Sequence, residues 1–209
     1  MKKTLVILCV SLCVMFSCKP KEDDSAITPQ NGHEYVDLGL PSGLKWATCN
    51  VGASSPEKYG YYFAWGETAP KAEYTVENSI AYGEDMNDIS GNPQYDAARA
   101  NWGGSWRMPT EDEMEELVTH CEWGWTQVKG VSGCKVIGPN GRSIFLPAAG
   151  YRRGSSLYDA GSGGLCWSST PCGGNWLDGS AYSIRFYSNH LITNYNGRDF
   201  GVSVRPVSE

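Results

Sequence analysis

Cysteine is the residue type in this chain with the widest range of chemistry, because a thiolate can form a disulfide, bind a soft metal ion or act as a nucleophile. Eight cysteines occur in 209 residues, three of them within the first eighteen. The other five are Cys49, Cys121, Cys134, Cys166 and Cys172. Since an odd number of thiols cannot all pair within one chain, at least one is expected to stay free or to pair outside it.

Two disulfides are expected if the chain reaches an oxidising compartment. We predict a bridge between Cys49 and Cys121 and a second one between Cys166 and Cys172, while the spacing leaves other pairings open. A zinc site is not expected, because the chain has no CxxC motif and its histidines are scattered along it. These histidines are His33, His120 and His190.

Carboxylates are concentrated between residues 111 and 116, where a helix is expected, and paired carboxylates can act as general acid and base. A carboxylate on an exposed helix face keeps its ordinary pKa, however, whereas an acid catalyst needs a buried one. The chain also lacks the GxSxG, HExxH and phosphate-binding glycine motifs. We therefore expect a protein that is not an enzyme and that takes no metal or other cofactor.

The first seventeen residues are typical of a secretory signal peptide. Lys2 and Lys3 precede an apolar run at residues 5–16, which is too short to span a bilayer. Ser17 and Cys18 then resemble the end of a bacterial lipobox, which predicts that Cys18 carries the lipid anchor. The alternative is cleavage by the ordinary signal peptidase, which would leave Cys18 free.

Residues 18–33 are expected to form a flexible tether, because Pro20 and the charges at 19–24 cannot pack a core. The acidic run after Cys18 resembles the surface-export signal of Bacteroidetes lipoproteins, and Asp24-Ser25-Ala26 resembles the O-glycosylation motif of the same phylum, with Ser25 as the acceptor. An outer-membrane lipoprotein exposed at the cell surface is therefore expected, with a plain linker as the alternative. A formal charge of −6 disfavours nucleic acid as a partner. The oligomeric state is left open.

Residues 34–209 are expected to form one α+β domain. Helices are predicted at 94–101 and 110–121, the second with Thr110 and Glu113 as a capping box. Alternation of apolar and polar residues, and turn signals such as Pro139-Asn140-Gly141, predict short antiparallel strands. The predicted strands cover residues 34–40, 44–49, 123–128, 134–137, 142–146, 165–169, 181–187 and 200–204. Segments 66–92 and 151–164 are expected to be loops.

Several strings in this chain together resemble one known family. They are residues 35–52 (YVDLGLPSGLKWATCNVG), 63–67 (FAWGE), 101–110 (NWGGSWRMPT), 145–151 (FLPAAGY), 167–170 (WSST) and 201–207 (GVSVRPV). This set is similar to the Fibrobacter succinogenes major paralogous domain of Bacteroidetes lipoproteins. The resemblance implies a C-type-lectin-like fold, related to that of formylglycine-generating enzymes.

The resemblance also implies two candidate sites. Formylglycine-generating enzymes carry a reactive cysteine pair at a place comparable to Cys166 and Cys172, so copper-dependent oxidation is one alternative. In a lectin-like fold the loops near residues 151–180 would face a ligand, and Trp176, Asp178 and Asn189 have side chains suited to a sugar. Leu177 replaces the amide residue of calcium-dependent lectins, so calcium is not expected.

We expect a non-enzymatic binding or adhesion module for a glycan or protein, with a structural or assembly role in the envelope as the alternative. Trp123 and Trp125 alternate on one predicted strand and are expected in the core. Trp102 and Trp106 flank a Gly-Gly turn and are also expected to be buried. Arg205 is expected to form an internal ion pair or to cap backbone carbonyls.

Overall fold

Helix α2 (Glu111–His120) forms where the capping signals place it. The hydroxyl of Thr110 accepts a hydrogen bond from the backbone N–H of Glu113, and the Glu113 carboxylate accepts one from the backbone N–H of Thr110. Three acidic residues in the first turn complement the positive end of the helix dipole. Met114 and Leu117 lie on the buried face, so the predicted helix is confirmed.

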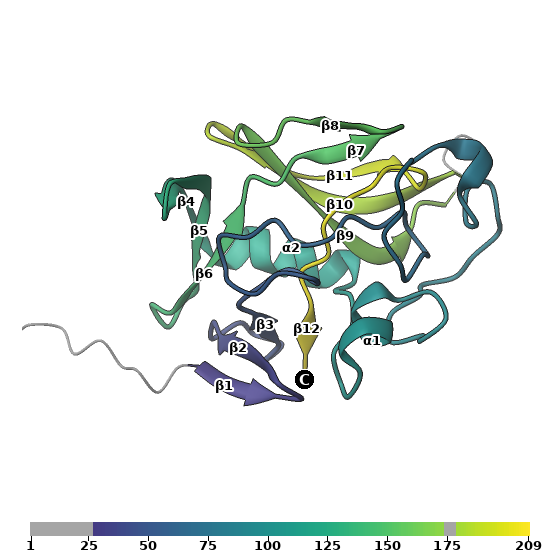
Figure 1. Ribbon diagram of the computed structural model, residues 1–209. Helices are drawn as coiled ribbons and strands as arrows, with labels where there is room; N and C mark the ends of the chain where they lie inside the picture. Colours follow the sequence, from purple (N-terminus) through teal and green to yellow (C-terminus); the bar gives the residue numbers. More distant parts are fainter. Residues whose placement is uncertain (1–26, 174–178) are drawn as a thin grey trace, which may run out of the picture.

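The computed structural model describes residues 27–173 and 179–209, and its sheets and few helices confirm the α+β class (Figure 1). Antiparallel strands pair in the orders β1-β2-β3-β12, β4-β5-β6, β11-β10-β9 and β7-β8. The helical elements are η2 (Val76–Asn78), α1 (Ala97–Trp102) and α2. The strands are β1 (Ile27–Gln30), β2 (His33–Asp37), β3 (Lys45–Ala47), β4 (Glu122–Val128), β5 (Val131–Ile137), β6 (Ser143–Pro147), β7 (Tyr151–Arg153), β8 (Ser156–Tyr158), β9 (Gly163–Pro171), β10 (Ser180–Tyr187), β11 (His190–Gly197) and β12 (Val207–Ser208).

The two ends of the described chain meet in one sheet. Strand β12, close to the C-terminus, pairs with β3, and β3 pairs with β2 (Figure 1). Its register places Val207 opposite Trp46, and both side chains are buried. The C-terminal residues are therefore a structural part of the N-terminal sheet.

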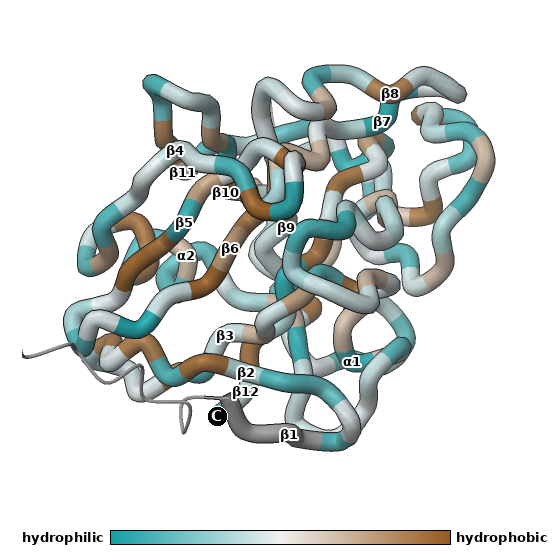
Figure 2. Tube along the Cα trace, turned by 60° about the vertical axis from the view of Figure 1, so that its left-hand side comes forward, coloured by the Kyte–Doolittle hydropathy of each residue, from teal (hydrophilic) through white to brown (hydrophobic). Residues whose placement is uncertain are grey.

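Helix α2 packs against β9, β10 and β11, and its apolar face joins the first of two large hydrophobic clusters. This cluster also takes apolar residues from β2, β5 and β6, which appear as brown stretches in Figure 2. The second cluster lies around α1 and contains Trp65, Trp102, Trp106 and Trp167. Burial of Trp102 and Trp106 confirms the prediction for these two indoles.

A buried guanidinium joins the two ends of the domain. Arg205 is fully buried and donates hydrogen bonds to the carbonyl oxygens of Ala47, Thr48 and Phe145 and to the Asn50 side chain, over 2.9–3.0 Å. Burial lowers the pKa of Arg205 to about 10. Of the two alternatives expected for Arg205, an internal ion pair or the capping of backbone carbonyls, the structure shows the second.

Apart from the short helix η2, the segment at 66–92 is an ordered loop, and a buried carboxylate helps to hold it. Asp96 accepts hydrogen bonds from the backbone N–H groups of Gly91, Arg99 and Met108, at 2.7–2.9 Å. It thereby caps α1 and ties the end of the loop to the segment that leads into α2. Burial raises the pKa of the Asp96 carboxyl.

Three expectations about the elements were wrong, and one strand had no prediction. Strand β1 lies inside the predicted tether 18–33, so ordered structure begins before the expected boundary at residue 34. Strands β7 and β8 form a hairpin inside the predicted loop 151–164. Strand β11 had no prediction, because its alternation is interrupted by polar residues; long-range pairing with β10 stabilises it. The predicted strand 200–204 forms only isolated bridges.

Candidate functional site

Two tryptophans on β4 form one wall of the candidate site. Trp123 and Trp125 stand two positions apart, so their side chains leave the same face of the strand. They lie opposite Val136 and Cys134 of β5. Because β4 is the edge strand of its sheet, both indoles remain partly exposed while they pack against the first hydrophobic cluster.

The turn between β10 and β11 forms the other wall. Tyr187 and His190 are the last pair of this hairpin, and Ser188 and Asn189 make the turn. Asn189 and His190 are exposed. Figures 1 and 2 both place this end of the hairpin beside β4.

Between these walls lies a cavity of about 270 Å³, which we name the indole groove. Trp123, Trp125, Tyr187, Asn189 and His190 line it, together with the buried Cys134. The groove is a little smaller than a typical drug-sized pocket of roughly 300 Å³ or more. It is therefore suited to a small unit such as one sugar ring or one side chain.

Specific contacts fix the aromatic residues that line the groove. The indole N–H of Trp123 donates to the carbonyl oxygen of Leu117 over 3.4 Å, and its ring lies 6.0 Å from that of Phe186. The Tyr187 hydroxyl donates to Asp159 over 2.7 Å. Burial raises the pKa of the Tyr187 phenol, which is therefore neutral at neutral pH. These contacts preorganise the aromatic surfaces before any ligand arrives.

The indole groove combines chemistry for recognition. Flat indole faces contact apolar C–H groups, while the Asn189 amide and the His190 imidazole offer hydrogen-bond donors and acceptors. Burial raises the pKa of the Cys134 thiol to about 11, so this group is not a thiolate near neutral pH. The arrangement is suited to holding a ligand.

Among the predicted ligand-binding residues, Asn189 lies in the groove. Trp176 and Asp178 lie outside the described residues, as do Cys18 and Ser25. Trp123 and Trp125 were expected in the core. They do pack against the first hydrophobic cluster, but they also remain partly exposed, which was not expected. A signal was present in the sequence, because exposed Glu122 and Gly124 alternate with them as on a half-solvated edge strand.

The structure forms neither predicted disulfide: all five cysteines of the described chain are free thiols. Cys166 lies opposite Ile184 of β10, and Cys172 bonds to Ser180, four positions away along that strand, which separates their Cα atoms by roughly 13 Å. Bridged cysteines have Cα atoms about 4.4–6.8 Å apart. Cys121 is buried among the residues of α2, whereas Cys49 lies partly exposed beside His33.

The cysteine pair of the oxidase alternative does not fit a copper site either. The separation of Cys166 and Cys172 prevents one ion from binding both thiols. Burial raises the pKa of each thiol to about 11. Within residues 27–173 and 179–209, no group of three or more His, Cys, Asp or Glu side chains could hold a metal ion.

Comparisons with protein-family models, with curated proteins and with solved structures found no match. The family resemblance of the sequence therefore stays a prediction. In the part of the chain that the structure describes, no helix has the length and apolar character to cross a membrane.

Proposed function

We propose that this protein is a lipid-anchored, surface-displayed binding module that recognises a glycan through the indole groove. The observation that carries the proposal is the meeting of two partly exposed indoles from β4 with Asn189 and His190 from the β10–β11 turn. Aromatic rings supply a large contact area at low entropic cost, and the amide and imidazole supply orientation.

The proposal includes a C-type-lectin-like fold for the domain. Its support is the α+β class, the pairing of the two ends of the chain in one sheet, and a long ordered loop between β3 and α1. The anchor at Cys18 and the display at the cell surface rest on the signal peptide and the acidic segment after it.

Binding of the purified protein to a glycan array tests the groove. We expect one class of glycan to bind, and Trp125→Ala to weaken that binding by at least about tenfold, as truncation of a central aromatic anchor does. Asn189→Ala should weaken it too, and this exposed turn residue is not expected to affect folding.

Tyr195→Ala is the matched control, because Tyr195 is an exposed aromatic residue on β11, toward the other end of that strand from the turn. It should leave glycan binding unchanged. Glycan binding that survives both Trp125→Ala and Asn189→Ala would exclude the indole groove. A partner found only among proteins would exclude a glycan as the ligand.

The anchor has a separate test. Mass spectrometry of native material should find acyl chains on Cys18 and no residues before it. Protease added to intact cells should release the domain. An unmodified Cys18, or full protection from the protease, contradicts this part of the proposal without touching the groove.

A further inference from the structure

A second cavity lies away from the indole groove, between the aromatic segment at residues 59–65 and strand β7. It has a volume of about 320 Å³ and is lined by three tyrosines and two cationic residues. These are Tyr61, Tyr62, Tyr74, Lys71 and Arg152. We name it the tyrosine–arginine pocket. None of these residues had a predicted role.

Two of the tyrosines are fixed walls. The Tyr62 hydroxyl donates to the carbonyl oxygen of Ala149, and the Tyr74 hydroxyl donates to the carbonyl oxygen of Tyr62, each over 2.6 Å. Both residues are buried. Their rings therefore keep their positions whether or not the pocket is occupied.

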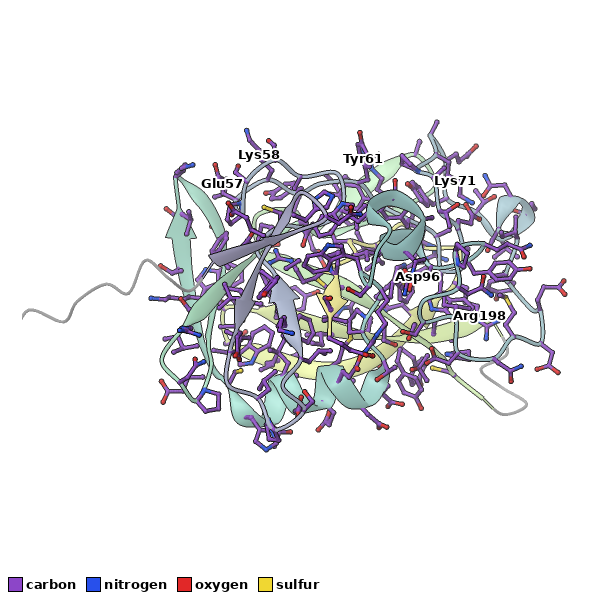
Figure 3. All side chains as sticks on the ribbon, turned by 90° about the horizontal axis from the view of Figure 1, so that it is seen from below. Glu57, Lys58, Tyr61, Lys71, Asp96 and Arg198 are labelled. Atoms are coloured by element: carbon purple, nitrogen blue, oxygen red, sulfur yellow. The ribbon has the colours of Figure 1, made fainter. Side chains whose placement is uncertain are left out.

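Tyr61 is the exposed wall, with 49% of its surface accessible. Its ring lies against Gly52, where a Cβ atom would approach within 2.4 Å of the ring, so the glycine is what allows this packing. Figure 3 shows Tyr61 at the edge of the molecule at which Lys71 also lies. Tyr61 therefore presents an aromatic surface to solvent beside the two buried tyrosines of the pocket.

The two cations differ in how their charge is balanced. Lys71 forms an ion pair with Glu67 at 2.8 Å and also donates to the carbonyl oxygen of Asn78. Arg152 lies 5.2 Å above the Tyr62 ring and donates to the carbonyl oxygen of Ser155 over 3.4 Å. Among the residues that the structure describes, Arg152 forms no ion pair. The pocket thus carries a guanidinium whose charge no carboxylate balances.

Local positive charge is informative because the chain as a whole is acidic, with a formal charge of −6. A guanidinium presents five N–H donors in a planar fork that matches a carboxylate in two parallel hydrogen bonds. Tyrosine rings beside it can contact the C–H face of a sugar ring. One carboxylate attached to one ring would satisfy both features.

We propose that the tyrosine–arginine pocket binds an acidic sugar of the uronic acid class, with Arg152 holding the carboxylate and Tyr61 contacting the ring. This site shares no lining residue with the indole groove, so its test is independent of the function proposed above.

Calorimetric titration of the full chain in detergent tests the proposal with two matched probes. Methyl β-glucuronide carries the carboxylate, and methyl β-glucoside has the same ring without it. We expect the glucuronide to bind about 10- to 100-fold more tightly, as a hydrogen-bonded charge pair predicts. Added salt should reduce the difference.

Arg152→Gln should remove the preference for the glucuronide. Arg152→Lys keeps the charge and loses the fork, so it should retain only part of the preference. The matched control is Arg153→Gln, which makes the same charge change at the next residue, whose guanidinium lies over the Phe200 ring. Arg153→Gln should leave the preference intact.

Circular dichroism of each variant confirms that it is folded. Equal binding of the two probes, absence of binding by either, or an equal loss in Arg152→Gln and Arg153→Gln would overturn the proposal. Binding of a glutamate-rich peptide without binding of the glucuronide would overturn it as well. Survival of glucuronide binding in Trp125→Ala separates this pocket from the indole groove.

Discussion

Two pairs of tryptophans show how one residue type serves different ends in this protein. Trp102 and Trp106 meet edge to face, with ring centroids 5.1 Å apart, and are 7% and 0% exposed. His33 stacks on Trp102 at 3.7 Å, which closes this cluster from the β2 side. Trp123 and Trp125, in contrast, remain partly exposed and line the indole groove.

The difference comes from what surrounds each pair. Trp102 ends α1, and the turn at Gly103 and Gly104, both with positive φ, carries the chain back so that Trp106 is covered on every side. Trp123 and Trp125 stand on an edge strand, whose sheet covers them from one side only. Burial by neighbouring segments, and not the residue type, therefore distinguishes a core indole from one that is available for binding.

The largest expected effect is on stability. Trp106→Ala should lower the free energy of unfolding by about 3–5 kcal/mol, because it leaves a cavity in a closed cluster. Trp125→Ala should cost only about 1–2 kcal/mol, because its side chain is already partly in water. Urea denaturation followed by circular dichroism measures both values. Equal losses would remove the distinction between the two pairs.

The next largest effect on stability is expected at the Gly103-Gly104 turn, which lies between the buried Trp102 and Trp106. Gly104→Ala should lower the free energy of unfolding by about 1–2 kcal/mol, because φ is +59° there and an L-residue is strained in this region. Gly124→Ala on β4 is the control, since its φ is not positive and an added Cβ would meet open space. Denaturation curves should show no loss for Gly124→Ala. A loss as large as that of Gly104→Ala would contradict the expectation.

The reactivity of the Cys134 thiol reports on the packing of Trp125 in the indole groove. Cys134 lies opposite Trp125 and is 4% exposed, and burial raises the pKa of its thiol to about 11. Alkylation at pH 8 should therefore be slow at Cys134 and faster at the partly exposed Cys49. Trp125→Ala should accelerate modification of Cys134 and leave Cys49 unchanged, as peptide mass mapping can show. An unchanged rate at Cys134 would mean that Trp125 does not shield it.

The smallest effect concerns the ion pair that ties the β4–β5 turn to the loop after β3. Glu57 lies 3.0 Å from Lys129. Its own backbone N–H, followed by Lys129, lowers the pKa of the Glu57 carboxyl from 4.5 to about 2. A lowered pKa means that the ionised carboxylate stabilises the fold above about pH 4.5, and that this contribution is lost as the pH falls toward 2.

Glu57→Gln should therefore lower the urea midpoint at pH 6 and converge with the parent protein near pH 2. Lys58→Gln, a change at the adjacent charged residue labelled in Figure 3, is the control and should show no such convergence. A Glu57→Gln difference that stays constant with pH would rule out a contribution from the ionised carboxylate.

Local signals predicted the elements of the site better than they predicted the site itself. The capping box at Thr110 and Glu113 and the turn at Pro139-Asn140-Gly141 act over a few residues, so they could be recognised from sequence. Strand β11 depends on pairing with β10, and the groove depends on contact between two hairpins. The free state of Cys166 and Cys172 depends on the extended path of β9 between them.

The amino-acid sequence by itself determined the α+β class, the start of α2 and the burial of Trp102 and Trp106. Each of these follows from short-range chemistry or from the cost of leaving a large apolar group exposed. Only the tertiary structure decided that β4 is an edge strand, that Asn189 lies beside its indoles, and that Arg152 has no ion-pair partner among the described residues. These features arise where segments far apart in the chain meet, and local spacing does not encode which segments those are.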